Sequence, residues 1–376
     1  MIVKYNKNLI MIFFFPKSKL ESIDSILPLI YDLKKNHSTD STVIFQNQKD
    51  LELIKKNIFI YDTLKNFSNI RVIKKKNIIL NKFRVILLIF YLFFKTLFRS
   101  KIIHFTQFDQ WPFKIISLVF PQNIYRCNSN SYHDERRNFI NKILILNEAN
   151  HKPVGKNIIA LNDEFKNKFN DGGNIIFDYK MPRLRKFWHD YVRDNSSIYL
   201  EKYHPKYYKN KKIIFFAITS LHDQGFIRDG ASIKIFNQIL NLLVKKFKDH
   251  LIFIKPHPTT SLQNLHELTK DKKNVEITFL HPSLLSYKAS FFICDLFSTV
   301  TTDAYYLGLT TIEYSIYDKQ TLKLTNNKSV GKNFVDYFFH EDLQSLEKLF
   351  ESNFIKKKKQ YTYSDFNDLL IKNLLN

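Results

Sequence analysis

The stretch Leu251-Ile-Phe-Ile-Lys-Pro-His-Pro258 carries the strongest fold signal in this chain. Its first four residues are apolar and rich in Ile and Phe, a pattern typical of a buried strand. The strand must end at Lys255, because two prolines around one histidine remove backbone donors and fix the chain on both sides of the imidazole. A cationic Lys255 and a rigidly placed His257 are therefore predicted at a strand tip, where open α/β sheets bind ligands.

A second apolar strand is predicted in Phe292-Ile-Cys-Asp-Leu-Phe-Ser-Thr-Val-Thr-Thr-Asp303, which breaks into a cluster of hydroxyl residues. The hydroxyls stand at the expected start of a helix, where free backbone N–H groups and side-chain oxygens form a site for anions. We expect Ser298 and Thr299 to lie at the same edge of one sheet as His257. The combination suits a phosphate-bearing ligand.

The length and composition favour two globular domains. The chain has 376 residues, of which 44% are hydrophobic and 15% aromatic, enough for two cores. It contains only 7 glycines and neither a G-x-G-x-x-G nor a Walker-type sequence, so anions must be bound by helix starts, hydroxyls, His and Lys. Cys127 and Cys294 stand far apart without metal-ligand spacing, which favours two buried thiols in a reducing compartment and no metal site.

The formal net charge of +23 admits three kinds of partner: nucleic acid, an anionic membrane surface or an acidic substrate. A general bias of the sequence toward Lys, Asn and Ile explains the charge equally well. The basic residues are spread along the chain, and no nucleic-acid-binding module is recognisable. We therefore expect no nucleic acid partner.

Strand-like and helix-like segments alternate along both halves of the chain, which predicts parallel sheets covered by helices on both faces. The predicted strands are 9–15, 41–46, 70–73 and 102–105 in the first half, and 212–218, 250–255, 275–279, 291–296 and 311–315 in the second. The predicted helices are 21–35, 50–56, 83–98, 231–247, 262–269, 283–289 and 302–307, with 181–194 as a connecting segment. We divide the chain into an N-terminal domain over 1–195, a C-terminal domain over 196–350 and a tail over 351–376.

The predicted helix 83–98 is strongly apolar and allows two interpretations. Its uninterrupted apolar core, Val85 to Phe94, is too short to span a bilayer. A helix buried in the N-terminal domain is the simpler interpretation. The alternative is a helix lying in a membrane interface, with basic flanking residues on lipid phosphates. Those flanking residues are Arg84, Lys95, Arg99 and Lys101.

The C-terminal half resembles the bacterial sialyltransferase and polysialyltransferase group, whose members carry an acidic-acidic-Gly motif, a His-Pro motif and a Ser-Ser or Ser-Thr motif. His257-Pro258 matches the second motif and Ser298-Thr299 the third, in the same order. The first motif is imperfect, since Asp223-Gln224-Gly225 has Gln in place of the second acid and Arg228-Asp229-Gly230 also has one acid. The resemblance covers 212–315. Its last part, Cys294 to Gly308, is also similar to capsule Kdo transferases and CDP-glycerol glycerophosphotransferases.

The resemblance implies a GT-B fold, in which two Rossmann-like β/α/β domains face each other across a cleft. It places the nucleotide on the C-terminal domain and the acceptor on the N-terminal domain. CMP is the leaving group in all three similar groups, and donors fixed before the reaction stabilise the charge that it gathers. His257 would donate to its phosphate without a metal ion. The other expected donor-binding residues are Lys255, Pro258, Ser298, Thr299, His281 near the base and Glu313 near the ribose.

A carboxylate at a strand tip suits the base that the acceptor hydroxyl needs. Asp223 is the first candidate, because it follows a predicted strand. Asp229 is the second, although it could instead cap the following helix. In the N-terminal domain, polar residues after the strand 102–105 are expected to face the acceptor, namely His104, Gln107 and Asp109.

These observations lead to a leading function and two alternatives. The leading one is a metal-independent glycosyltransferase that moves sialic acid, another nonulosonate or Kdo from its CMP form to a glycan in bacterial surface polysaccharide. The alternatives are a CDP-glycerol or CDP-alditol phosphotransferase, and a non-catalytic basic protein that binds membranes or nucleic acid. Because glycan acceptors are often lipid-linked, we expect a cytoplasmic protein at the inner face of the cytoplasmic membrane, bound to an anionic surface.

Overall fold

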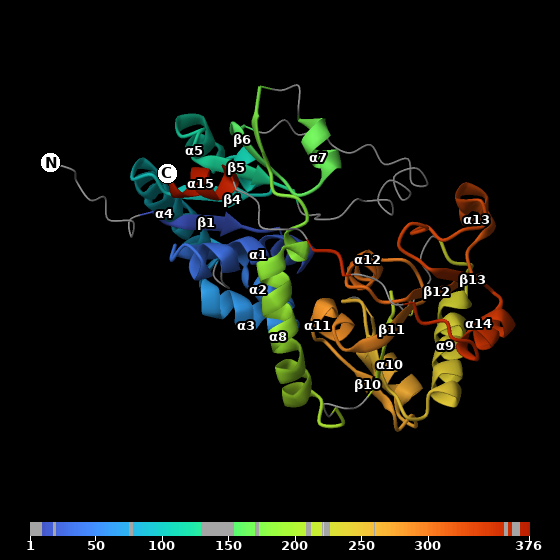
Figure 1. Cartoon of the computed structure of the whole chain (residues 1–376). Coiled ribbons are helices and arrows are strands. Elements are labelled where there is room, and N and C mark those ends of the chain that lie inside the picture. Colours follow the sequence, from blue (N-terminus) through green and yellow to red (C-terminus); the bar gives the residue numbers. More distant parts are fainter. Residues whose placement is uncertain are drawn as a thin grey trace. The chain divides into compact units, whose positions relative to one another are not determined.

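The computed structural model describes residues 10–17, 20–74, 78–128, 154–169, 173–207, 212–219, 221, 226–258, 260–356, 360–362 and 369–376. They form two compact α/β units (Figure 1). Unit 1 holds the described residues of Met1–His133, Asn147–His189 and Tyr363–Asn376, and unit 2 holds those of Asp190–Thr362. The chain therefore leaves unit 1 within one helix, and its C-terminal segment belongs to unit 1 again.

Unit 1 is built on a parallel sheet of order β3-β2-β1-β4-β5-β6-β7. The strands are β1 (Ile12–Phe15), β2 (Ser41–Asn47), β3 (Asn69–Lys74), β4 (Lys101–His104), β5 (Ile124–Cys127), β6 (Asn157–Ala160) and β7 (Ile175–Asp178). The helices are α1 (Leu20–Lys35), α2 (Gln48–Lys55), α3 (Ile58–Phe67), α4 (Ile78–Leu97), α5 (Lys114–Val119), α7 (Asp163–Lys168), α8 (Lys186–Tyr203, entering unit 2) and α15 (Leu369–Leu375), with short 3₁₀ turns at Gln107–Asp109 and Pro182–Leu184.

Unit 2 is built on a second parallel sheet, of order β10-β9-β8-β11-β12-β13. Its chain order outward from β8 is that of a doubly wound Rossmann sheet, and the order reverses between β8 and β11. The strands are β8 (Ile213–Ala217), β9 (Leu251–Lys255), β10 (Val275–Ile277), β11 (Ala289–Cys294), β12 (Thr311–Ser315) and β13 (Tyr337–His340). The helices are α9 (Ala231–Lys246), α10 (Leu262–Thr269), α11 (Pro282–Ser286), α12 (Thr299–Tyr306), α13 (Lys319–Thr325) and α14 (Leu343–Phe350).

The central strands of unit 2, β8, β9, β11 and β12, are largely buried on both faces, as their continuous apolar sequences predict. On one face Phe216 of β8 stacks on Phe236 of α9, with ring centres 5.7 Å apart. On the other face Phe215 meets Phe292 of β11 edge to face at 5.0 Å. Successive residues of a strand point to opposite sides, so Phe215 and Phe216 contribute to the packing on opposite faces of the sheet.

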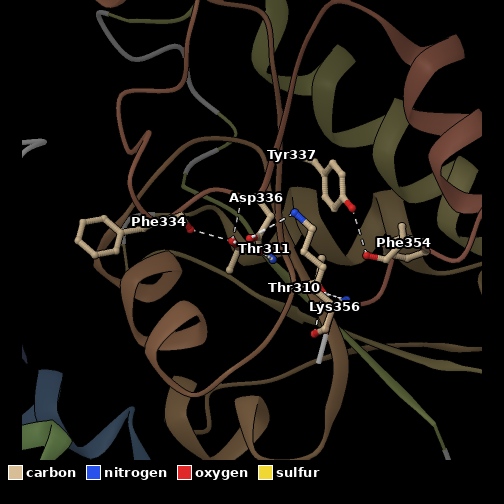
Figure 2. Close-up of polar contacts among 7 residues, drawn as sticks. All are labelled: Thr310, Thr311, Phe334, Asp336, Tyr337, Phe354 and Lys356. Atoms are coloured by element: carbon tan, nitrogen blue, oxygen red, sulfur yellow. Dashed lines mark hydrogen bonds and ion pairs between the residues drawn. The ribbon is translucent and has the colours of Figure 1, made fainter. Parts of the chain in front are cut away.

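A polar cluster closes the amino-terminal edge of the unit 2 sheet (Figure 2). The N–H of Thr311, the first residue of β12, donates to the Asp336 carboxylate at 2.8 Å, and the Thr311 hydroxyl lies 2.7 Å from the Phe334 carbonyl. The N–H of Lys356 donates to the hydroxyl of Thr310 at 2.7 Å, and the Lys356 ammonium lies 4.5 Å from the centre of the Tyr337 ring. These contacts fix the segment after α14 at the edge opposite to the strand tips.

The structure corrects the sequence prediction at residues 181–194. This segment was expected to be a connection, but it forms a 3₁₀ turn and the first half of α8. Two of its arginines are buried: Arg183 forms an ion pair with Asp24 of α1, and the Arg185 guanidinium lies 3.7 Å from the centre of the Tyr179 ring. Buried arginines interrupt the apolar pattern, and the partner of Arg183 lies far away in the sequence. The pattern alone could therefore not reveal that this segment is a turn leading into a helix.

The buried-helix interpretation of 83–98 is right for only one face of α4. Val85, Leu88 and Leu92 pack into the core of unit 1. The opposite face is open, and both Phe83 and Phe90 are more than half exposed. None of the helices in the described part of the chain combines the length and the apolar character that crossing a membrane requires.

Candidate functional site

Three strands of unit 2, β8, β9 and β11, end in one transverse row, and β12 crosses that row two residues before its own end. Parallel pairing aligns Lys255 of β9 with Ala217 of β8, Ala217 with Cys294 of β11, and Cys294 with Glu313 of β12. The residues that follow β8, β9 and β11 leave the sheet at its carboxyl edge, on either side of the point where the strand order reverses. Doubly wound sheets bind their ligands at this place.

Lys255 supplies a positive charge at this edge. Its Nζ lies 5.7 Å from the centre of the Phe279 ring, in the segment after β10. Among the carboxylates that the structure describes, none forms an ion pair with it. Burial lowers the pKa of Lys255 to about 8, because the ammonium has lost water without gaining a carboxylate. A cation in this setting is well placed to receive an anion.

His257 lies two residues beyond Lys255 and is exposed. β9 ends at Lys255, as the flanking prolines predict. The His257 carbonyl accepts the N–H of Thr260 at 2.9 Å, which turns the chain toward α10. The imidazole is therefore carried on a short, backbone-constrained turn at the strand tip, as expected.

The hydroxyl cluster after β11 forms the start of α12. The helix begins at Thr299, three residues earlier than predicted, with Ser298 as its N-cap. The N–H of Ser298 donates to Oγ1 of Thr301 at 3.2 Å. Because the first N–H groups of a helix have no intrahelical acceptor, those of Thr299 and Val300 can receive an anion. Both predicted hydroxyl residues thus lie in the first turn of a helix at the carboxyl edge.

Asp295 is a site residue that sequence reasoning missed. It follows β11 and is buried, and its carboxylate accepts the N–H of Thr219 at 2.9 Å and the Thr219 hydroxyl at 3.1 Å. Burial is the main cause that raises the pKa of Asp295 to about 7, although the Thr219 hydrogen bonds oppose it. The pair ties the tips of β8 and β11 together. An acid directly after an apolar strand was the available signal.

Of the two candidate bases, the structure describes only Asp229. Asp223 lies outside the described residues. Asp229 is exposed and precedes Gly230, which is the N-cap of α9 at φ 75°. Gly230 holds the cap position, so the alternative that Asp229 caps this helix is wrong. The neighbouring Arg228 donates its N–H to the Ile316 carbonyl at 3.0 Å, which places this segment beside the chain that follows β12.

His281 and Glu313 are buried and hydrogen-bonded. His281 is the N-cap of α11, and its Nδ1 accepts the N–H of Ser283 at 3.1 Å. Glu313 accepts the hydroxyls of Tyr317 and Ser329, each at 2.5 Å. These contacts hold the fold around the carboxyl edge, and the expected contacts of both residues with base and ribose stay predictions.

The three expected acceptor residues of unit 1 also have partners within the fold. Burial lowers the pKa of His104 to about 3, so the ring stays neutral, and its Nδ1 accepts the N–H of Phe108 at 3.4 Å. The side-chain amide of Gln107 donates to the Pro16 carbonyl at 2.9 Å. Asp109 forms a buried ion pair with Arg126 at 3.0 Å. The acceptor role of these side chains stays a prediction.

No known protein-family profile and no curated protein matches this sequence. Solved structures do match. UDP-GlcNAc 2-epimerase from Methanocaldococcus jannaschii is 14% identical with a TM-score of 0.56, covering 94% of this chain and 96% of its own. Another UDP-N-acetylglucosamine 2-epimerase is 13% identical with a TM-score of 0.53, covering 94% and 92%. A sialyltransferase from Photobacterium damsela is 11% identical with a TM-score of 0.47, covering 87% and 81%.

Identities this low show the fold alone. The α/β class with two Rossmann-like units of the GT-B fold, predicted from the sequence, is confirmed.

Proposed function

We propose that the protein is a glycosyltransferase that moves an acidic sugar from its CMP-activated form to a glycan acceptor of bacterial surface polysaccharide. The sugar would be sialic acid, another nonulosonate or Kdo. The observation that supports this most is the Lys255 ammonium at the carboxyl edge of unit 2, with no ion-pair partner among the described carboxylates. His257 and the start of α12 lie at the same edge, and together they suit a phosphate that gathers charge as it leaves.

In the proposed reaction, an acceptor hydroxyl oxygen bonds to the anomeric carbon while the bond from that carbon to the CMP oxygen breaks. The electron pair of the broken bond stays on the phosphate. There His257 donates a hydrogen bond, Lys255 contributes its charge, and the N–H groups of Thr299 and Val300 face the oxygens. The hydroxyl proton goes to a carboxylate, for which Asp223 is the first candidate and Asp229 the second. No step requires a metal ion.

Calorimetric titration of the full chain with CMP, CDP and UDP tests the nucleotide assignment. CMP should bind with unchanged affinity in the presence of a chelator, and more tightly than UDP. Tighter binding of UDP would overturn the CMP assignment and favour a UDP-sugar enzyme. A strict requirement for magnesium or manganese would indicate a different transferase class.

The base assignment is tested by Asp223→Asn and Asp229→Asn, made separately. The variant that lacks the base should still bind CMP with parental affinity but fail in transfer, because only the proton acceptor has been removed. Normal transfer by both variants would place the base elsewhere.

We further propose that the acceptor is lipid-linked, which would bring the protein to the inner face of the cytoplasmic membrane.

A further inference from the structure

The outward face of α4 carries a continuous apolar stripe. Its six residues recur at alternating intervals of three and four, which keeps them on one side of a helix. Each of the six is between 47% and 60% exposed. They are Leu80, Phe83, Leu87, Phe90, Phe94 and Leu97.

The stripe is separate from the face that holds α4 in the fold. Val85, Leu88 and Leu92, which pack into the core of unit 1, lie on the opposite side of the helix by the same periodicity. The exposed residues are therefore not needed to attach α4 to the sheet. A large open apolar face of this kind is typical of an interaction site.

The neighbouring helix α5 extends the exposed apolar surface. α5 packs beside α4, where Phe120 meets Phe93 of α4 edge to face at 4.9 Å. Ile115, Leu118 and Val119 on α5 are between 41% and 56% exposed. Twelve of the twenty large exposed hydrophobic side chains in the described part of the chain lie between Leu80 and Val119, so this surface is a patch and not the usual scatter.

The exposed charges of the segment of the chain that carries the patch have one sign. The sequence from Ile78 to Asn123 contains six basic residues, and its single acid, Asp109, is buried against Arg126. By helical periodicity, Lys82 flanks the stripe on one side, and both Arg84 and Lys95 flank it on the other. Long basic side chains beside an apolar face can reach lipid phosphates while their stems cover apolar surface. The six bases are Lys82, Arg84, Lys95, Arg99, Lys101 and Lys114.

We infer that this face of α4 and α5 docks on an anionic lipid surface, with the stripe in the interface and the flanking bases on headgroup phosphates. Charge complementarity selects this partner, because a second copy related by twofold symmetry would bring one basic rim against another. The inference deepens the proposed function by naming the surface that would reach a lipid-linked acceptor, and it rests on that function only in this respect. α4 lies in the interface and does not cross it.

Flotation of the full chain with vesicles tests the inference. The parent should bind phosphatidylglycerol-containing vesicles at low salt, bind less at high salt, and bind neutral phosphatidylcholine vesicles weakly. Phe83→Ser/Phe90→Ser/Phe94→Ser should lower the partition coefficient by at least about tenfold, since the inserted side chains are removed. The matched control Ile198→Ser/Ile233→Ser changes exposed apolar residues on α8 and α9 and should bind like the parent.

The electrostatic part has its own pair of variants. Lys82→Glu/Arg99→Glu should lose binding to anionic vesicles at low salt. Lys248→Glu/Lys270→Glu changes the net charge equally at exposed positions of unit 2 and should keep it. Trp111, which is 69% exposed, should report insertion by a blue shift of its fluorescence, whereas Trp188 is buried and stays silent.

The outcomes distinguish a lipid surface from a second copy as the partner of the patch. They also distinguish failure of the docking inference from failure of the proposed function. Failure of the parent to bind anionic vesicles, or undiminished binding by the triple Phe variant, overturns the inference. A concentration-dependent dimer that the triple Phe variant abolishes, without vesicle binding, would assign the patch to a second copy. CMP titration of the triple Phe variant without vesicles should match the parent. Vesicle binding without CMP binding in the parent would leave the docking surface standing and remove the proposed function.

Discussion

At the scale of one residue, the buried charge of Lys255 destabilises the fold and thereby indicates a binding site. Burial without a described carboxylate partner weakens the preference of this ammonium for its charged form and lowers its pKa to about 8, so it is still mostly charged at neutral pH. Proteins place such groups where a ligand supplies the missing charge. The lysine should therefore weaken the fold slightly while it strengthens the binding of an anion.

Replacing Lys255 with Met tests both effects, the lower stability and the stronger anion binding. Lys255→Met should raise the free energy of unfolding at neutral pH by on the order of 1 kcal/mol. The reason is that the lowered pKa of the lysine means that its charge is less favourable in the folded than in the unfolded state. It should also weaken CMP binding at least about tenfold, since a charged contact to phosphate is lost. Denaturant unfolding and calorimetry measure the two effects. Lys273→Met, at an exposed position before β10, is the control and should change neither; a loss of stability without loss of CMP affinity would make Lys255 purely structural.

The pKa of Lys255 also predicts how CMP affinity depends on pH. Above about 8 the free protein loses the ammonium, so binding must take up a proton and affinity falls as pH rises. The decline should reach at most about tenfold per pH unit, since one proton is involved. Titrations between pH 7 and 10 (about the range of this transition) should show the decline in the parent and a flat profile in Lys255→Met. A parental profile as flat as that of the variant would contradict the assignment.

Asp295→Asn probes the link between β8 and β11. The pKa of Asp295 is raised from 3.8 to about 7, so the folded state holds more protons than the unfolded state between these values, and stability falls as pH rises across this window. Asn cannot ionise, so the variant should gain stability relative to the parent from pH 4 to 7. Transfer should fall between about 10- and 100-fold, because the segment bearing Asp223 begins next to Thr219. CMP affinity should be retained; an equal loss of CMP affinity would indicate general damage to the site, for which Asp249→Asn at an exposed position is the control.

The individual elements show which parts of the site the sequence can predict. The β9 strand and its proline-bounded tip were predictable, because an apolar run and two prolines act locally. The start of α12 was predicted three residues late, since a run of threonines carries little periodicity. β5 escaped prediction because Arg126 interrupts its apolar pattern, and only the fold supplies the partner, Asp109, that lets this arginine be buried.

The amino-terminal edge of β12 offers a stability test that leaves the site untouched. Thr311→Val keeps the shape of the side chain but removes the hydroxyl that contacts Phe334 and Asp336, leaving those buried acceptors with fewer donors. The free energy of unfolding should fall by about 1–2 kcal/mol. Thr311→Ser keeps the hydroxyl and should lose less. Both variants should bind CMP like the parent, because the cluster lies at the edge opposite to Lys255; reduced CMP affinity in Thr311→Val would show that the two edges are coupled.

At the scale of the whole molecule, the sequence predicted two Rossmann-like units because their strands alternate with amphipathic helices in both halves. It did not predict that α15 packs on β7, since a short C-terminal apolar segment gives no indication of its partner. It also left open whether α4 is buried, because both of its faces are apolar and only packing shows which one is covered. Long-range contacts, not local patterns, decide such points.

The most direct measurement is CMP release by the full chain from CMP-sialic acid and CMP-Kdo, with a chelator present, beside CDP-glycerol and UDP-GlcNAc. The parent should turn over a CMP-sugar and leave the other two donors intact. His257→Ala should lower the rate by about 10²–10³, the usual loss for one donor to a developing charge. His266→Ala, an exposed histidine on α10, should have no effect. Turnover of UDP-GlcNAc or CDP-glycerol alone, or a parental rate in His257→Ala, would contradict a CMP-sugar site at this edge.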